Sequence, residues 1–130
     1  MKYSMTEKGF AGDLPFGEIQ VSSNEEFGFR PFQLLVSSLA VCSGGVMRKV
    51  LEKMRMPAED IQIEVKEVVR IEEEASRVSK VHLHFTLTGD IDKQKMPRVM
   101  ELTRKNCSMV RTMENSIDIV ETYEVLQQGT

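Results

Sequence analysis

The longest apolar stretch of the chain predicts a helix that spans residues 31–55. Pro31 stands at a favoured first-turn position, and Pro57 ends the helix just after Met56. No charged residue lies between Leu34 and Met47. We therefore expect this helix to be buried nearly all round, with a second subunit covering what one small domain cannot. Its apolar positions are Leu34, Leu35, Leu39, Ala40, Val41, Cys42, Val46, Met47, Val50, Leu51 and Met54.

Two alternating segments after this helix predict an antiparallel hairpin. In each, apolar residues take every second position and polar residues lie between them, so each strand offers one face to a helix and one to water. The acidic segment EEEASR is the expected turn, with its charges in solvent. The apolar positions are Ile61, Ile63, Val65, Val69 and Ile71 in the first segment, and Val81, Leu83, Phe85 and Leu87 in the second.

The rest of the chain completes an α+β pattern. We expect short strands at residues 2–7 and 18–22 around a loop at 9–17, a second helix at 92–105 and a last strand at 116–126. The expected order is β–α–β–β–α–β. No repeat, low-complexity tract or linker divides the sequence, so residues 1–130 are expected to form a single domain.

Composition narrows the class of protein. The 130 residues are 41% hydrophobic and 28% charged, as in a soluble globular chain. The net charge of -3 argues against a nucleic-acid partner. The first residues lack an apolar signal-type core, and no uncharged apolar run reaches the length of a membrane span, so we expect a cytoplasmic protein with no membrane partner. Nine methionines suggest an adaptable apolar cleft.

Cys42 lies on the apolar stripe of the first helix. It is either inert core filling or a nucleophile in a dry cleft. Gly44 and Gly45 follow it, and glycine in a helix interior costs about 1 kcal/mol relative to alanine, so something is expected to approach closely there. That neighbour could be a reactant or simply another helix backbone.

Cys107 stands where the second helical pattern breaks, between Asn106 and Ser108. Ser108 is a candidate N-cap, and a thiol at this junction is expected to be exposed enough to exchange. The nearby cations Arg104, Lys105 and Arg111 would favour a thiolate. The alternative is an ordinary half-buried cysteine at a helix kink.

No metal or cofactor site is expected. The two cysteines stand 65 positions apart without the spacing of a zinc site, and in a reducing compartment they should be thiols. His82 and His84 could chelate a metal as a pair, but alternation places them on the solvent face with no third ligand in view.

Three segments carry a resemblance to a known family. RPFQLLVSSLAVCSGGVMRKVLEKM, VHLHFTLTGD and KNCSMVRTMENSIDIVETYEV are together similar to the OsmC/Ohr family of peroxide-stress proteins. The resemblance implies an intertwined homodimer with two long central helices and the sheets outside. It also implies that Cys42 attacks a hydroperoxide and that Cys107 resolves the sulfenic acid as a disulfide. The reductant would be a dithiol, either a lipoylated protein or a thioredoxin-like one.

The chain departs from the family pattern at three places. The Ohr branch has a glutamate ten residues before the first cysteine, where this chain has Phe32 followed by Gln33. The N-terminal segment lacks the family's arginine, and the first arginine is Arg30. Ser108 replaces the proline that usually follows the second cysteine. These departures indicate an OsmC-like subfamily.

A cysteine this far into a helix needs a cation or hydrogen-bond donor to become a thiolate. Arg30 precedes Cys42 by roughly 18 Å along the helix axis, so we expect Arg30 to serve Cys42 of the other subunit, with Lys8 a weaker candidate. The alternative is that Arg30 is a solvated residue that simply precedes the helix. The expected function is reduction of organic hydroperoxides. The alternatives are a non-catalytic protein that binds an apolar ligand in the dimer cleft, and a structural or regulatory dimer. The expected substrate contacts are Phe32, Gln33, Leu35, Met47 and Met109.

Overall fold

A computed structural model describes residues 1–127 of the chain. These residues form two compact units, Met1–Ser37 and a second that begins at Ser38. The boundary falls inside the long helix α1 (Pro31–Lys53), so each unit is described separately. The single-domain expectation stays a prediction.

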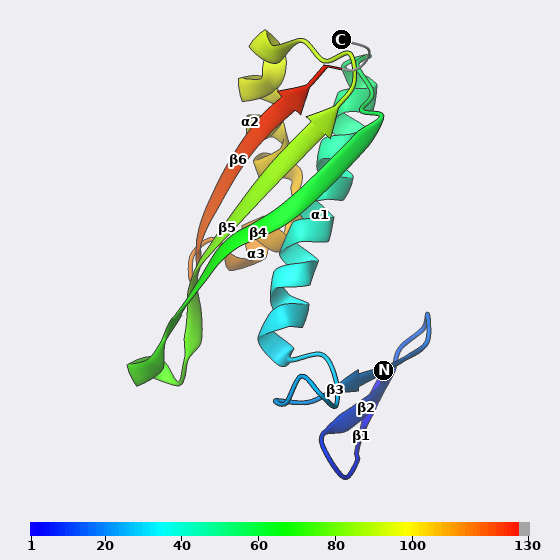
Figure 1. Ribbon diagram of the computed structural model, residues 1–130, viewed down its shortest axis with the longest axis vertical. Helices are drawn as coiled ribbons and strands as arrows, with labels where there is room; N and C mark the ends of the chain where they lie inside the picture. Colours follow the sequence, from blue (N-terminus) through cyan, green and yellow to red (C-terminus); the bar gives the residue numbers. More distant parts are fainter. Residues whose placement is uncertain (128–130) are drawn as a thin grey trace. The chain divides into compact units, whose positions relative to one another are not determined.

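The first unit contains a small antiparallel sheet. Its strands β1 (Lys2–Met5), β2 (Phe10–Asp13) and β3 (Glu18–Val21) pair in the order β1-β2-β3 (Figure 1). Strands β1 and β3 confirm the expected pair, but β2 lies inside the segment expected to be a loop, so that expectation was wrong. Gly12 faces Tyr3 across the β1–β2 pair, and a Cβ there would lie 2.7 Å from the Tyr3 ring. The glycine that suggested a loop instead makes room for an aromatic ring in a sheet.

The long helix begins at the expected proline and ends near the expected place. Arg55 adopts a left-handed conformation just beyond α1, with φ 61°, which stops the helix before Pro57. The side chains of Leu39, Met47 and Leu51 are fully buried. Val41 is 71% exposed in the single chain, and its cover by a second subunit stays a prediction. One face of the helix remains open.

The second unit is built on a three-stranded sheet. Strands β4 (Asp60–Ile71) and β5 (Arg77–Thr88) form the expected antiparallel hairpin, and β6 (Asp118–Leu126) pairs parallel to β5. The short 3-10 helix η1 (Glu72–Glu74) lies in the hairpin turn. Two register shifts in β4, between Val65 and Glu67 and between Val69 and Arg70, break the simple alternation expected there.

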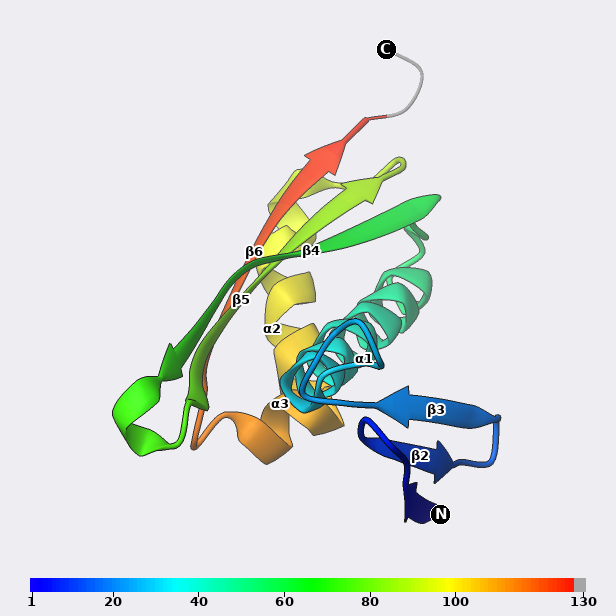
Figure 2. The ribbon, with the colours of Figure 1, turned by 60° about the horizontal axis from the view of Figure 1, so that its bottom comes forward.

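The helices cover one face of this sheet, as Figure 2 shows. Helix α2 (Met96–Asn106) and helix α3 (Ser108–Met113) replace the single helix expected at residues 92–105. The segment before α2 forms a short 3-10 helix, η2 (Lys93–Lys95), because the Asp92 carboxylate accepts a hydrogen bond from the Gln94 N–H. The core between sheet and helices includes Leu39, Met47, Leu51, Val81, Leu83, Phe85, Leu87, Val99 and Val110, all fully buried.

Candidate active site

The fold of the second unit brings Cys42 and Cys107 together. Cys42 lies in the middle of α1, and Cys107 lies between α2 and α3; both are free thiols. The two side chains are close enough to hydrogen-bond and to shift each other's pKa. The two thiols are therefore neighbours within the same chain.

Cys42 is half-buried, and its environment favours the thiolate. Burial raises its pKa, but hydrogen bonds from the Met109 N–H, from the Ser108 hydroxyl and from Cys107 outweigh burial, so the pKa of Cys42 is lowered overall. The Ser108 hydroxyl lies 3.6 Å from the Cys42 sulfur. Ser108 and Met109 are the first residues of α3 and direct their backbone N–H groups toward this sulfur.

Cys107 has the opposite character. It is fully buried, and burial raises its pKa, only partly offset by the Ser43 hydroxyl and the Val110 N–H. The expected exposure of this thiol was therefore wrong, as was the expectation that neighbouring cations would favour its thiolate. Cys107 itself occupies the N-cap position of α3, with extended backbone and no side-chain cap bond, so the expected Ser108 N-cap was also wrong.

Arg104 and Glu121 form an ion pair that the sequence analysis missed. Arg104 on α2 donates to the Glu121 carboxylate on β6 at 3.2 Å and to the Ile119 carbonyl at 2.8 Å. The Glu121 side chain is only 5% exposed. The alternation of β6 could have found it, because Glu121 follows buried Ile119 by two positions and pairs with buried Leu83.

Ser43 lies between this carboxylate and Cys107. The Ser43 hydroxyl donates to the Cys107 sulfur at 3.5 Å, and Ser43 is fully buried. The same hydroxyl lies near enough to the Glu121 carboxylate to lower its pKa by hydrogen bonding. Since a hydroxyl carries one proton, it can serve only one of these two acceptors at a time.

Four of the expected site residues lie in the first unit. The Arg30 guanidinium stacks over the Phe32 ring, 4.8 Å from its centroid. The Gln33 side chain accepts a hydrogen bond from the Arg30 N–H, and the Gln33 N–H donates to the Arg30 carbonyl, so Gln33 caps the start of α1. Leu35 is half-buried in α1. The approach of Arg30 to the cysteine of another subunit stays a prediction.

The remaining expected contacts differ in exposure. Met109 is half-buried and donates its N–H to Cys42, whereas Met47 is fully buried in the core. A cavity of about 430 Å³ opens beside the exposed face of α1. Neither cysteine lines it; its walls are Val41, Gly44, Gly45, Arg48, Ala58, Glu59, Asp60, Ile61 and Ile63.

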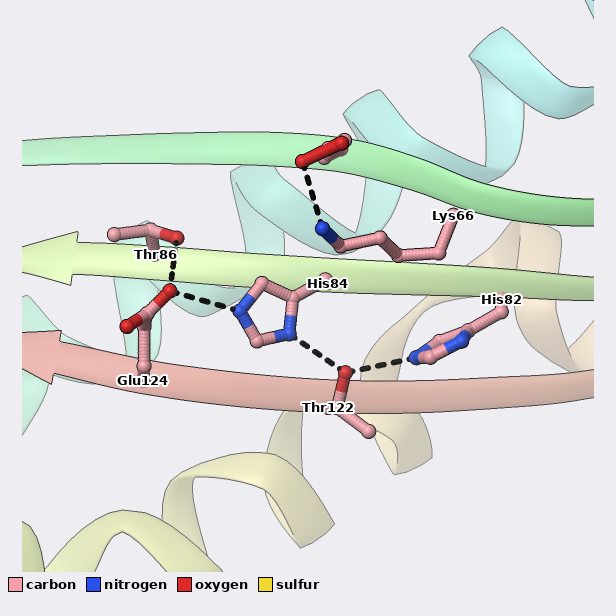
Figure 3. Close-up of polar contacts among 7 residues, drawn as sticks. Lys66, His82, His84, Thr86, Thr122 and Glu124 are labelled. Carbon is pink, nitrogen blue, oxygen red and sulfur yellow. Dashed lines mark hydrogen bonds and ion pairs between the residues drawn. The ribbon is translucent and has the colours of Figure 1, made fainter.

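The two histidines form a polar cluster on the outer face of the sheet (Figure 3). His82 and His84 both hydrogen-bond the Thr122 hydroxyl, at 2.8 and 2.7 Å, and His84 also contacts the Glu124 carboxylate at 3.1 Å. Thr86 donates to the same carboxylate. Among residues 1–127, no group of three or more potential metal ligands comes together, so these side chains satisfy one another instead.

Comparison with solved structures shows the fold. The chain is 22% identical to a hypothetical protein from Aquifex aeolicus VF5, with a TM-score of 0.87 over 98% of this chain and 96% of that one. It is 14% identical to an OsmC-like protein from Mycoplasma pneumoniae, with a TM-score of 0.81 over 97% and 94% of the two chains. The organic hydroperoxide resistance protein OhrB of Bacillus subtilis is 17% identical, with a TM-score of 0.72 over 95% of each chain.

The sequence itself identifies the family. No curated protein matches it at a significant level. The family model of OsmC-like proteins, however, matches residues 22–122, which include both cysteines, Ser43, Arg104 and Glu121. The chain therefore belongs to the family of OsmC-like proteins.

Proposed function

We propose that this protein is a thiol-dependent peroxidase that reduces organic hydroperoxides, with Cys42 as the attacking and Cys107 as the resolving cysteine. The observation that carries this proposal is the contrast between two neighbouring thiols. The pKa of half-buried Cys42 is lowered and that of fully buried Cys107 is raised. A peroxide therefore meets a reactive, reachable thiolate, with a protected thiol beside it.

The chemistry proceeds in two steps. The Cys42 thiolate attacks the outer oxygen of the hydroperoxide; an S–O bond forms, the O–O bond breaks, and the alkoxide takes a proton and leaves as an alcohol. Cys107 then attacks the sulfur of the Cys42 sulfenic acid, which releases water and forms a disulfide. Donors from Ser108 and Met109 stabilise the starting thiolate.

Names of related structures support the substrate class. Solved proteins with this fold include organic hydroperoxide resistance proteins from Bacillus subtilis and Elizabethkingia anophelis. We accordingly propose that the substrate is an alkyl or lipid hydroperoxide. Its proposed contacts are Phe32, Gln33, Leu35 and Met109. A cellular dithiol, lipoylated or thioredoxin-like, would return the disulfide to two thiols.

We also propose that the protein acts as a cytoplasmic homodimer. Val41 is 71% exposed on an apolar helix, and the first unit exposes several large apolar side chains, so a second copy has apolar surface to cover. The helix α1 is apolar enough to cross a membrane by length and composition alone, but core helices of soluble proteins share that character. In the dimer, Arg30 would approach Cys42 of the second copy. The exposed large apolar side chains of the first unit are Met1, Tyr3, Met5, Phe10, Phe16, Phe27 and Phe29.

The test follows the two thiols after one equivalent of cumene hydroperoxide is added to reduced protein. Wild-type protein should lose two thiols and form an internal disulfide, seen by intact mass. Cys107→Ser should accumulate a Cys42 sulfenic acid that dimedone traps. Cys42→Ser should keep its Cys107 thiol.

Two outcomes would contradict the proposal. If both wild-type thiols survive excess peroxide, the peroxidase proposal fails, and the protein should be examined for a bound apolar ligand. If Cys42→Ser still loses its thiol rapidly, the roles of the cysteines are wrong. Arg30→Ala tests the arginine separately, because an unchanged pKa of Cys42 would exclude Arg30 from the site.

A further inference from the structure

The Glu121 carboxylate is a base held away from water. Its side chain is 5% exposed, and burial raises its pKa, while the Arg104 charge partly lowers it. Arg104 bonds Oε1; Oε2 is also buried and has no well-oriented hydrogen bond from residues 1–127. Burying a carboxylate in this way is costly, and a hydrophobic residue would serve packing better. One oxygen of this carboxylate can still accept a proton.

Ser43 connects that carboxylate to the resolving cysteine. Its hydroxyl lies 3.5 Å from the Cys107 sulfur and interacts with the Glu121 carboxylate. Cys107, Ser43 and Glu121 come from the α2–α3 junction, from α1 and from β6, and all three belong to the second unit. The charged or titratable groups near Ser43 include Cys107 and Glu121, which it contacts, and their partners Cys42 and Arg104.

We propose that Glu121, acting through the Ser43 hydroxyl, accepts the proton that Cys107 loses when it attacks the oxidised Cys42. This inference rests on the proposed function and adds to it a positioning residue for the second step. Cys107 is fully buried, so bulk water does not contact its sulfur and cannot accept its proton directly. A buried thiol needs an internal acceptor, and the Ser43 hydroxyl is its contact toward one.

Disulfide formation moves the Cys107 proton to Glu121 and releases the Cys42 oxygen as water. The Cys107 sulfur forms a bond to the Cys42 sulfur, and the S–O bond of the sulfenic acid breaks. The Cys107 proton passes to the Ser43 oxygen while the Ser43 proton passes to Glu121. The departing hydroxide takes one proton from solvent and leaves as water, and Glu121 later returns its proton to solvent. The Cys107 sulfur is oxidised and the Cys42 sulfur is reduced.

A thiol reagent tests this transfer without any peroxide. Dithiobis(nitrobenzoate) should react first at Cys42, releasing one thionitrobenzoate, and Cys107 should then expel the second as the disulfide closes. The second release requires the same deprotonation of Cys107. In Glu121→Gln and in Ser43→Ala, we expect the second release to slow by about 100-fold, the usual range for a lost general base, while the first stays within about twofold.

The pH dependence separates proton transfer from a merely structural role. In the wild-type protein the second release should be flat once Glu121 is ionised. In Glu121→Gln it should rise about tenfold per pH unit until the Cys107 thiol ionises. Ser43→Thr keeps a hydroxyl, so its second release should stay close to the wild-type rate, unlike that of Ser43→Ala. Glu124→Gln, an exposed carboxylate on the same strand, is the matched control and should change neither release.

Two results would overturn the proposal. A wild-type second release in Glu121→Gln would exclude the carboxylate. A uniform loss at every pH, with the wild-type pH dependence kept, would assign Glu121 a purely structural role. Neither result would affect the peroxidase proposal, which the hydroperoxide experiment decides independently.

Discussion

The hydroxyl of Ser108 lies 3.6 Å from the sulfur of Cys42. Ser108 also directs its backbone N–H toward that sulfur, so one residue supplies two donors. The family that the sequence resembles usually has a proline here, which has neither a hydroxyl nor an N–H. The serine that departs from the pattern thus supplies part of the thiolate stabilisation for which we invoked Arg30.

Substituting Ser108 should therefore make Cys42 less reactive. Ser108→Ala loses the hydroxyl and Ser108→Pro loses both donors, although proline is well tolerated in the first turn of a helix. We expect Ser108→Ala to slow alkylation of Cys42 by iodoacetamide about tenfold at neutral pH, since a hydrogen bond to a charged group contributes about 1.5–3 kcal/mol, and Ser108→Pro to slow it further. The measurement is the alkylation rate against pH in a Cys107→Ser background.

A suitable comparison is Ser116→Ala, at an exposed serine beyond α3. It should leave the alkylation rate unchanged. If Ser108→Pro reacts as fast as the parent protein, the donors of α3 do not set the pKa of Cys42. Arg30 would then be the main candidate for the group that lowers this pKa.

Close packing against Ile63 explains why residue 44 is a glycine, but no such contact explains the glycine at position 45. A Cβ on Gly44 would lie 2.5 Å from Cδ1 of Ile63 on β4, whereas a Cβ on Gly45 would meet nothing within 4 Å. Alanine would favour the helix by about 1 kcal/mol, but overpacking costs about 1–3 kcal/mol. We expect Gly44→Ala to lower the free energy of unfolding by about 1 kcal/mol, measured by urea denaturation.

Shortening the partner side chain should relieve this clash. Ile63→Val removes Cδ1, so the double variant Gly44→Ala/Ile63→Val should be more stable than the sum of the single variants indicates. Strict additivity would show that Ile63 moves aside without cost and would leave Gly44 without this explanation.

Periodicity and proline positions predicted much of the fold. Pro31 and Pro57 bracket α1, two-residue alternation identified β4 and β5, and the expected last strand corresponds to β6. The same reasoning missed β2, because its residues FAGD are neither strictly alternating nor rich in β-branched side chains. The break at Cys107 was recognised, but α3 is too short for helical periodicity to establish its start.

The candidate site was less accessible to sequence reasoning. The pairing of Cys42 with Cys107 came from the family resemblance, since no local spacing connects residues 65 positions apart. Cys107 is buried against Cys42 and Ser43 of the distant helix α1, and the charges of residues near Asn106 could not reveal these contacts. Glu121 was overlooked because a carboxylate in a strand is usually solvated, although its position in the alternation places it on the buried face.

The histidine cluster of Figure 3 predicts how acid affects stability. Hydrogen bonds from His84 and then Thr86 lower the pKa of the exposed Glu124 carboxyl. A carboxyl whose pKa is lower in the folded state stabilises the fold above its unfolded-state pKa, and this contribution is lost as the pH falls through the folded-state value. As the pH falls from about 5 to about 3, the free energy of unfolding should therefore decrease less for Glu124→Gln than for the wild-type protein.

Urea denaturation at several pH values measures this difference. Glu73→Gln, in the exposed hairpin turn, is the comparison, and its pH dependence should follow the wild-type protein. Parallel acid profiles for wild type and Glu124→Gln would mean that the contacts with His84 and Thr86 do not favour the ionised carboxylate in solution.

Val41 allows a direct test of the proposed homodimer. Its side chain is 71% exposed in the middle of an apolar helix face, next to Gly45, whose missing side chain leaves open space. If a second copy covers this face, Val41→Glu buries an unpaired charge in the interface and should convert the dimer to monomers in sedimentation experiments. Val69→Glu places the same charge on β4, at a residue that is 36% exposed and pairs with Lys80, and should leave the dimer intact. A Val41→Glu protein that remains fully dimeric would show that this helix face is not the interface, and a monomeric wild-type protein would remove the second subunit from the proposed mechanism altogether.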